Sequence, residues 1–236
     1  MQDKKKIVIF GSEGRLGQVL TTALQNKFYI LGVDVSNTSN FTDEFNDSEG
    51  IELPELYRQE IYAVIHCQQF KPKEFVSHSI LDLDLDFTNS VMDINLILSL
   101  RSSSEYIKSC QKFAVMGRIV NVTSTYGIIS SNPTLYSGTE MGNPYAYTIS
   151  KFGLMGLTKY IASYFKEYNV LCNSISPHGI ENNQSLEFQD NFTKRSPLGR
   201  LSEPEEVVAA FNFLLDESNT YVNGANIPVD GGWTAC

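Results

Sequence analysis

The chain has 236 residues, of which 42% are hydrophobic and 19% are charged, a composition typical of one folded domain. Its 18 Lys and Arg residues are outnumbered by 27 Asp and Glu residues, which gives a formal net charge of −9. Because this charge repels nucleic-acid backbones and anionic membrane surfaces, we expect neither as a partner. No apolar run is long enough to span a membrane and no signal-peptide core follows the first residues, so we expect a cytoplasmic protein.

Short apolar runs alternate along the chain with longer segments in which apolar residues recur every three or four positions. This alternation predicts βαβ units around a parallel sheet that is buried on both faces. The expected strands, in chain order, are 7–10, 29–34, 63–67, 118–123, 171–176 and 225–229. The expected helices are 16–26, 87–108, 144–168 and 204–216. No composition break or internal repeat divides the chain, so we predict an α/β fold with a single doubly wound domain over residues 1–236.

The first expected strand runs into a glycine-rich turn, in which Gly11, Gly14 and Gly17 precede a helix. In a dinucleotide site such a turn brings the helix amino terminus toward the pyrophosphate, but a glycine triplet alone is also typical of an ordinary tight turn. Asp34 favours the dinucleotide, since a carboxylate at the end of the second strand accepts hydrogen bonds from the adenosine ribose and repels a 2′-phosphate. We therefore predict NAD in preference to NADP, although Arg15 could instead meet a 2′-phosphate.

Candidate catalytic groups follow the glycine turn at some distance along the chain. Tyr147 and Lys151 are four residues apart on one face of an expected helix. A buried ammonium beside a phenol lowers the pKa of the phenol, so we expect Tyr147 to exchange a proton with a hydroxyl or carbonyl group. The same spacing also occurs in exposed pairs without a function. Ser124 comes directly after the fourth expected strand, where ligands meet an open α/β sheet, and there it would polarise a carbonyl.

Together these motifs resemble the short-chain dehydrogenases and reductases, a family with a Rossmann fold, and the resemblance covers most of the chain. It implies that Ser124 orients the substrate and that Tyr147 is the general acid and base. It also implies that Lys151 binds the nicotinamide ribose and lowers the tyrosine pKa. The segment Asp93-Ile94-Asn95-Leu96 is similar to the family's helix segment whose asparagine holds a proton-relay water, which implies this role for Asn95.

The resemblance also implies a set of cofactor contacts. The residues expected to contact the cofactor are Gly11, Gly14, Arg15, Leu16, Gly17, Asp34, His66, Cys67, Tyr147, Lys151 and Ile180. The segment His66-Cys67-Gln68-Gln69 stands where the family usually has Asn-Asn-Ala-Gly, which would weaken cofactor binding. The spacing of the glycines is similar to the sugar-nucleotide branch of the family, whereas the tail over 197–201 and 223–232 is similar to the single-domain branch.

This mixture is similar to the oxidoreductases of bacterial surface-sugar and flagellin-modification pathways. It implies an NAD(P)-dependent oxidoreductase that moves a hydride between the nicotinamide and a carbonyl or hydroxyl carbon of a small, sugar-like substrate, which could be phosphorylated or nucleotide-linked. Substrate choice would depend on the insert 128–143 and on a substrate loop near 178–200. Two alternatives stay open: a non-catalytic dinucleotide-binding scaffold, and a sugar epimerase or dehydratase that uses the cofactor transiently.

Two further features concern partners and metals. Gly153 and Gly156 lie in the same helix as Tyr147, and each costs about 1 kcal/mol of helix propensity relative to alanine. Close packing on a second subunit would offset this cost, and in the family this helix lies at a subunit interface, so we expect a homodimer or homotetramer; the alternative is that the glycines face the protein's own sheet. His66, His78 and His178 lack metal-ligand spacing, and we expect no metal site.

Overall fold

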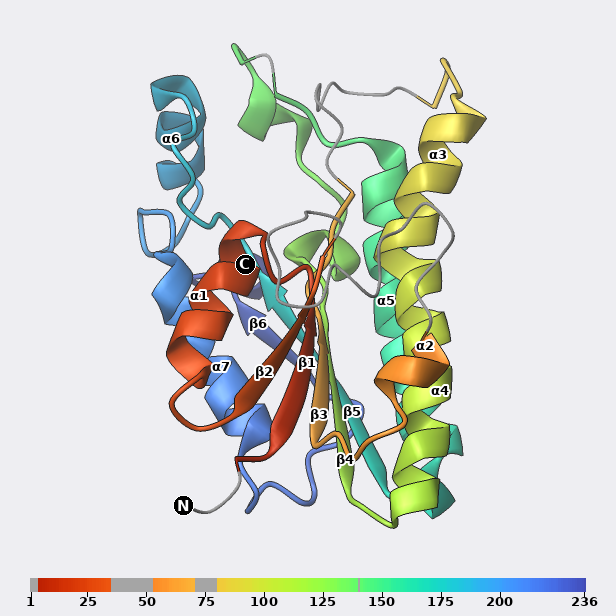
Figure 1. Cartoon of the computed structure of the whole chain (residues 1–236). Helices are drawn as coiled ribbons and strands as arrows, with labels where there is room; N and C mark the ends of the chain where they lie inside the picture. Colours follow the sequence, from red (N-terminus) through yellow and green to blue (C-terminus); the bar gives the residue numbers. More distant parts are fainter. Residues whose placement is uncertain (1–3, 35–52, 71–79, 140) are drawn as a thin grey trace.

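A six-stranded parallel sheet in the order β2-β1-β3-β4-β5-β6 forms the centre of the computed structural model, which describes residues 4–34, 53–70, 80–139 and 141–236 (Figure 1). The strands are β1 (Lys6–Phe10), β2 (Tyr29–Val33), β3 (Ala63–His66), β4 (Gly117–Val122), β5 (Val170–Pro177) and β6 (Asn226–Val229). All six expected strands form, and the prediction of a doubly wound α/β fold is confirmed. The order of the strands reverses between β1 and β3, which is the point where an open α/β sheet takes its ligand.

Helices cover both faces of the sheet (Figure 1). One face carries α1 (Arg15–Leu24) and α7 (Pro204–Leu215), and the other carries α2 (Leu53–Leu56), α4 (Leu98–Phe113) and α5 (Tyr145–Tyr164). The central strands are apolar because successive side chains enter opposite layers. In β1, Val8 packs in the same cluster as Tyr106 of α4. Its neighbour Ile9 packs with Leu20 of α1 and Phe211 of α7.

A single long helix was predicted over 87–108, and the structure divides it. Helix α3 (Leu85–Met92) continues through a π-helical turn (Asp93–Ile97) into α4. Such π turns are rare and often lie at functional sites. Neither this rod nor any other helix of the described residues combines the length and the apolarity of a membrane span.

A short helix, α6 (Leu186–Thr193), forms where the sequence predicted a polar loop. Its first turn is capped by Ser185, whose hydroxyl accepts the backbone N–H of Phe188. Phe188 and Phe192 lie one turn apart and pack with Leu135 and Trp233 in a small apolar cluster of their own. This cluster stabilises the loops that follow the carboxyl ends of the strands, where the candidate site lies.

Candidate active site

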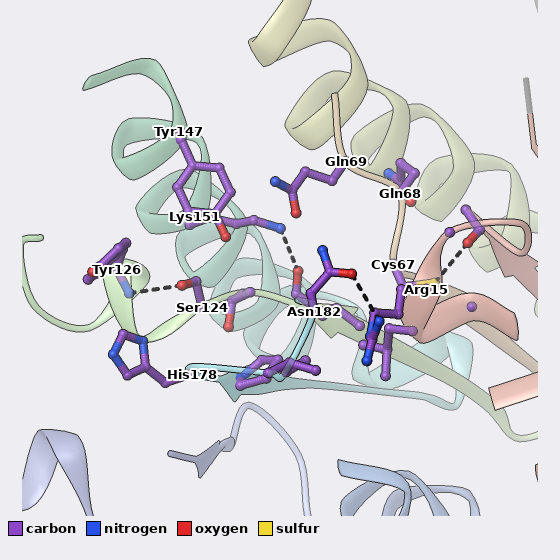
Figure 2. A pocket seen from close by; sticks show the side chains of 18 of the residues that line it. Arg15, Cys67, Gln68, Gln69, Ser124, Tyr126, Tyr147, Lys151, His178 and Asn182 are labelled. Carbon is purple, nitrogen blue, oxygen red and sulfur yellow. Dashed lines mark hydrogen bonds between the residues drawn. The ribbon is translucent and has the colours of Figure 1, made fainter. Parts of the chain in front are cut away.

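One cavity of about 600 Å³ joins the glycine turn to the tyrosine and lysine of α5. Its volume is in the range typical of small-molecule and cofactor sites. The predicted site residues that line it are Gly11, Gly14, Arg15, Leu16, Gly17, Asp34, Cys67, Ser124, Tyr147, Lys151 and Ile180. Figure 2 shows side chains from the segments that follow β3, β4 and β5, such as Cys67, Ser124 and His178, in one region with Tyr147 and Lys151 of α5. His66 and Asn95 do not line it.

The glycine turn is shaped for the close approach of a ligand. Gly11 has φ +77°, and a Cβ there would lie 2.6 Å from the backbone of Gln68. At Gly17 a Cβ would lie 2.0 Å from the carbonyl oxygen of Gly11, so α1 packs directly on the turn. Gly14 is the N-cap residue of α1, and no side chain caps the helix. The first N–H groups of α1 are therefore left for an anion, which fits the pyrophosphate of a dinucleotide.

Two charged side chains flank this turn. Asp34, directly after β2, accepts the backbone N–H of Glu13 through Oδ2, at 2.9 Å, and so its carboxylate is held at the cavity wall. Arg15 turns to the segment that follows β5: its Nη2 lies 2.8 Å from Oε2 of Glu181, and its Nη1 donates to Oδ1 of Asn182 at 2.9 Å (Figure 2). Arg15 thus ties the glycine turn to the opposite rim of the cavity.

Three of the four candidate catalytic residues, Ser124, Tyr147 and Lys151, converge at the other end of the cavity (Figure 2). Ser124 is the N-cap of a 3₁₀ turn, and its hydroxyl accepts the N–H of Tyr126 at 3.1 Å while also hydrogen-bonding with Tyr147. Lys151 Nζ donates to the carbonyl oxygen of Val122 at 2.9 Å and lies 5.5 Å from the ring centroid of Tyr147. The arrangement brings a phenol, a hydroxyl and an ammonium to one point.

Burial dominates the pKa values of this group. It raises the pKa of Tyr147 to about 12, against the lowering effect of the hydrogen bond with Ser124. It also lowers the pKa of Lys151 to about 8. The sequence-based expectation that Lys151 brings the tyrosine pKa down toward neutrality is therefore wrong for the protein alone, because desolvation is the largest influence on the pKa of each group. At neutral pH Tyr147 is a protonated acid.

His66, predicted as a cofactor contact, has its side chain inside the core instead. Its Nδ1 is 2.8 Å from Oδ1 of Asn121, and its Nε2 is 2.9 Å from the hydroxyl of Ser102. Burial lowers the pKa of the imidazole to about 4, so the ring is neutral near pH 7. Successive side chains of a strand point to opposite faces, and the next residue, Cys67, faces the cavity and donates from Sγ to the carbonyl oxygen of Phe10.

Asn95 lies in the π-helical turn and does not line the cavity, and both ends of its amide are hydrogen-bonded. Its Oδ1 accepts the N–H of Phe70 at 2.8 Å, and its Nδ2 donates to the hydroxyl of Ser150 at 3.1 Å. The adjacent Ile94 does line the cavity, and its carbonyl oxygen accepts a hydrogen bond from Gln68. Asn95 thereby joins the π turn to α5, one residue from Lys151.

Several lining residues were not named individually as site residues from the sequence, although the insert 128–143 and the loop near 178–200 were expected to determine substrate choice. Tyr126 and Tyr136 are joined through their hydroxyls at 2.9 Å, and Phe188 of α6 lies beside them. His178 stands between the rings of Tyr126 and Trp233. A residue two positions after Ser124 could have been foreseen at this edge of the sheet, but nothing in the local pattern of the insert marks Tyr136.

Comparison with known proteins agrees with this arrangement. A family profile described as Enoyl-(Acyl carrier protein) reductase matches residues 7–234. The chain belongs to the short-chain dehydrogenase/reductase family. Its similarity to individual members of the family is moderate but extends over most of the sequence.

Three members illustrate the relationship of this short-chain dehydrogenase/reductase to the others. The 7alpha-hydroxysteroid dehydrogenase of Bacteroides fragilis is 28% identical, with 98% of this chain and 95% of that enzyme aligned. Meso-2,3-butanediol dehydrogenase of Serratia marcescens is 32% identical over 170 residues, which are 68% of this chain and 61% of that enzyme. A short-chain dehydrogenase from Leptospira borgpetersenii, solved with bound NAD+, is 25% identical with a TM-score of 0.85, covering 98% of this chain and 93% of that one.

Proposed function

We propose that the protein is an NAD-dependent oxidoreductase that transfers a hydride between the nicotinamide and a carbonyl or hydroxyl carbon of a small molecule. One observation carries this proposal: a single cavity holds both the uncapped glycine turn and the group formed by Ser124, Tyr147 and Lys151. A dinucleotide-binding scaffold without catalysis has no physical need for a buried phenol and ammonium beside its cofactor. The solved relative with bound NAD+ supports the choice of cofactor class.

The residues present fit a nicotinamide dinucleotide along the whole cavity. The amino terminus of α1 and the turn at Gly11 and Gly14 would hold the pyrophosphate, and Asp34 would bind the adenosine ribose. NAD is favoured over NADP because a carboxylate at Asp34 repels a 2′-phosphate, while Arg15 is occupied by its pairing with Glu181. We expect Asp34→Asn to lower the ratio of the affinity for NAD to that for NADP by about tenfold, which corresponds to roughly 1.4 kcal/mol of binding free energy.

The bound nicotinamide supplies the hydride or accepts it. In the direction of reduction, Ser124 donates a hydrogen bond to the substrate carbonyl oxygen, and Tyr147 gives that oxygen its proton as the carbon gains the hydride. The charge of Lys151 stabilises the phenolate that remains. In the direction of oxidation Tyr147 takes the hydroxyl proton of the substrate, and Ser124 and Tyr147 hold the reacting oxygen. Because Tyr147 is protonated at neutral pH, the protein alone is prepared for reduction.

The sequence favoured a sugar-like substrate, with phosphorylated and nucleotide-linked sugars among the candidates. The charged side chains among the described lining residues are Glu13, Arg15, Asp34 and Lys151. None of these four belongs to the part of the cavity beyond Tyr147, where the described wall includes Leu135, Met141, Asn143 and Phe188. The charge of Arg195 acts on Tyr126 and His178 there, but Arg195 is not among the lining residues. An uncharged substrate is therefore favoured over a sugar phosphate, since a buried phosphate needs a cation or several donors to replace its water.

A homodimer or homotetramer through α4 and α5 is the second part of the proposal. Leu100 and Phe152 are large apolar side chains on these helices and are 46% and 45% exposed. The two glycines of α5 differ: a Cβ on Gly153 would lie 2.8 Å from Leu96, whereas a Cβ on Gly156 would have no atom within 4 Å. Gly153 is thus explained by packing within the chain, and Gly156 leaves room on the outer side of the helix for a second copy.

The test is to follow NADH absorbance with a panel of uncharged ketones and alcohols, phosphorylated sugars and nucleotide-linked sugars. We expect turnover with members of the uncharged group, and a loss of about 10²- to 10⁴-fold in Tyr147→Phe with NADH binding retained. NADH binding without turnover of any compound would indicate a scaffold. A converted sugar without net NADH formation would indicate an epimerase or dehydratase.

A further inference from the structure

Two tyrosines form a hydroxyl pair in the wall of the cavity. Tyr126 belongs to the 3₁₀ turn Thr125–Gly127, directly after Ser124, and Tyr136 ends the 3₁₀ turn Pro133–Tyr136. Their hydroxyl oxygens are 2.9 Å apart, and both residues line the cavity together with Tyr147. The catalytic proposal above uses neither of them.

The pair has one hydrogen-bond donor left over. When one hydroxyl donates to the other, the accepting hydroxyl keeps its own proton and can donate it elsewhere. Among the described residues, no further hydrogen bond of either hydroxyl is found. Burial raises the pKa of both tyrosines, so both remain protonated wherever the protein is folded at neutral pH. The pair is thus a neutral donor and cannot compete with Tyr147 as a base.

Neighbouring rings fix the position of this donor. The ring of Tyr126 meets His178 edge-on, with 5.4 Å between centroids, and the ring of Tyr136 packs against Phe188 at 6.0 Å. The backbone N–H of Tyr126 donates to the hydroxyl of Ser124. The same turn therefore sets both the serine that holds the reacting oxygen and the first member of the pair, so that a substrate can be held at two points with little loss of entropy on binding.

A donor of this kind contributes most when a substrate oxygen replaces the water that it would otherwise bind. The described wall near the pair includes the apolar side chains of Leu135, Met141 and Phe188, and the amide of Asn143 is a polar neighbour. A substrate without the second oxygen would leave the hydroxyl pair desolvated and unpaired, which costs affinity.

We propose that the hydroxyl pair of Tyr126 and Tyr136 is a specificity-determining subsite that binds a second oxygen of the substrate. The preferred substrates are then uncharged diols and hydroxyketones with an apolar body, in which the second oxygen lies a few bonds from the reacting carbon. This inference rests on the proposed oxidoreductase function and adds the substrate class to it.

The experiment compares a series of hydroxyketones and diols with ketones and alcohols of the same carbon skeleton that lack the second oxygen. We expect kcat/KM to be at least about tenfold higher for the compounds with two oxygens, as for the loss of one buried hydrogen bond. This preference should decrease in Tyr126→Phe and in Tyr136→Phe, chiefly through KM, because the remaining hydroxyl keeps its donor but loses the partner that fixes its position. The double variant keeps no hydroxyl to donate, so its preference should fall to about twofold or less, below that of either single variant.

Tyr221, which is 98% exposed, provides the matched control: Tyr221→Phe should keep the full preference. Thermal unfolding and NADH binding of each variant report whether the protein remains folded. Equal kcat/KM for both series in the wild-type protein, or an equal loss for both series in the two variants, would overturn the subsite. NADH binding without turnover of either series or of any other compound would overturn the oxidoreductase function itself.

Discussion

The ammonium of Lys151 donates a hydrogen bond to the carbonyl oxygen of Val122, 2.9 Å away at the end of β4. This contact attaches α5 to the sheet next to Ser124 and holds the cation 5.5 Å from the ring centroid of Tyr147. Burial lowers the pKa of Lys151 to about 8 and raises that of Tyr147 to about 12. Between about pH 8 and about pH 12 the lysine loses its charge and the tyrosine then loses its proton, so the site changes from an acid to a base over this range.

The first prediction concerns the pH dependence of the two directions of reaction. Reduction needs the protonated phenol, which is present below the Tyr147 pKa of about 12, whereas oxidation needs the phenolate, whose population increases with pH. We expect kcat/KM for oxidation to increase from neutral to alkaline pH and that for reduction to stay level below about pH 8, where Lys151 is charged. Initial rates in both directions, measured over this range, test the prediction.

The control for this prediction is the charge on residue 151. Lys151→Met removes the cation that stabilises the phenolate formed during turnover, so oxidation should fall by at least about tenfold below about pH 8, where the lysine is charged, and by less above it. Lys151→Arg should retain more activity than Lys151→Met. A pH profile of oxidation that is the same in the wild-type protein and in Lys151→Met would contradict the role given to the lysine.

The second prediction concerns the ion pair between Arg15 and Glu181. It joins the glycine turn to the rim after β5, and its side chains are only 35% and 34% exposed. Glu181→Gln removes the charge but preserves the shape of the side chain, and should weaken the attachment of the glycine turn to the rim by about 1 kcal/mol. We expect NADH to dissociate about fivefold faster, as measured by stopped-flow displacement. The exposed Glu167 gives a control, because Glu167→Gln removes the same charge away from the cavity and should leave the dissociation rate unchanged.

The third prediction separates the glycines of the turn. Gly17→Ala places a Cβ 2.0 Å from the carbonyl oxygen of Gly11, so α1 must move away from the turn that it packs on. At Gly14 the same contact would be 3.2 Å, which a small shift relieves. NADH titration should therefore show binding weakened by at least about tenfold in Gly17→Ala and by only a few-fold in Gly14→Ala. Similar losses in both variants would show that the close packing of α1 is not what shapes the site.

The sequence was sufficient to predict the strands and the meeting of the glycine turn with Ser124 and Tyr147. Alternating apolar periods are local signals, and the carboxyl ends of parallel strands must meet at one edge. Helix α6 was not predicted, because its polar composition hides the one-turn spacing of Phe188 and Phe192. The pairing of Tyr126 with Tyr136 depends on how two loops pack, which no local pattern encodes.

The case of His66 shows a different limit. It ends β3, and a side chain at that position can face either the cavity or the core, depending on the register of the strand. In β3, His66 is paired with Asn121 of β4, and both side chains enter the layer that contains Ser102. The resemblance to the family predicts only that the segment contacts the cofactor. The pleat of the strand decides which residue does so: the side chain of His66 lies in the core, and that of Cys67 faces the cavity.

The last prediction follows from this buried imidazole. The pKa of His66 is about 4 in the folded protein and ordinarily 6.5, so between these values the unfolded chain binds more protons. The stabilisation that the neutral ring provides is therefore complete above about pH 6.5 and is lost as the pH falls toward 4. We expect His66 alone to account for about 2 kcal/mol of the decrease in unfolding free energy between about pH 7.5 and pH 5.

Urea unfolding of the wild-type protein and of His66→Gln at both pH values tests this expectation. The glutamine cannot titrate, so the variant should be less stable at the higher pH, where it loses a hydrogen bond, yet should lose about 2 kcal/mol less on acidification. His178, whose pKa burial also lowers to about 4, continues to titrate in this variant and explains why some acid dependence must remain. If His66→Gln keeps the full acid dependence of the wild-type protein, then protonation of a group other than His66 causes the loss of stability, because the variant has no imidazole at this position.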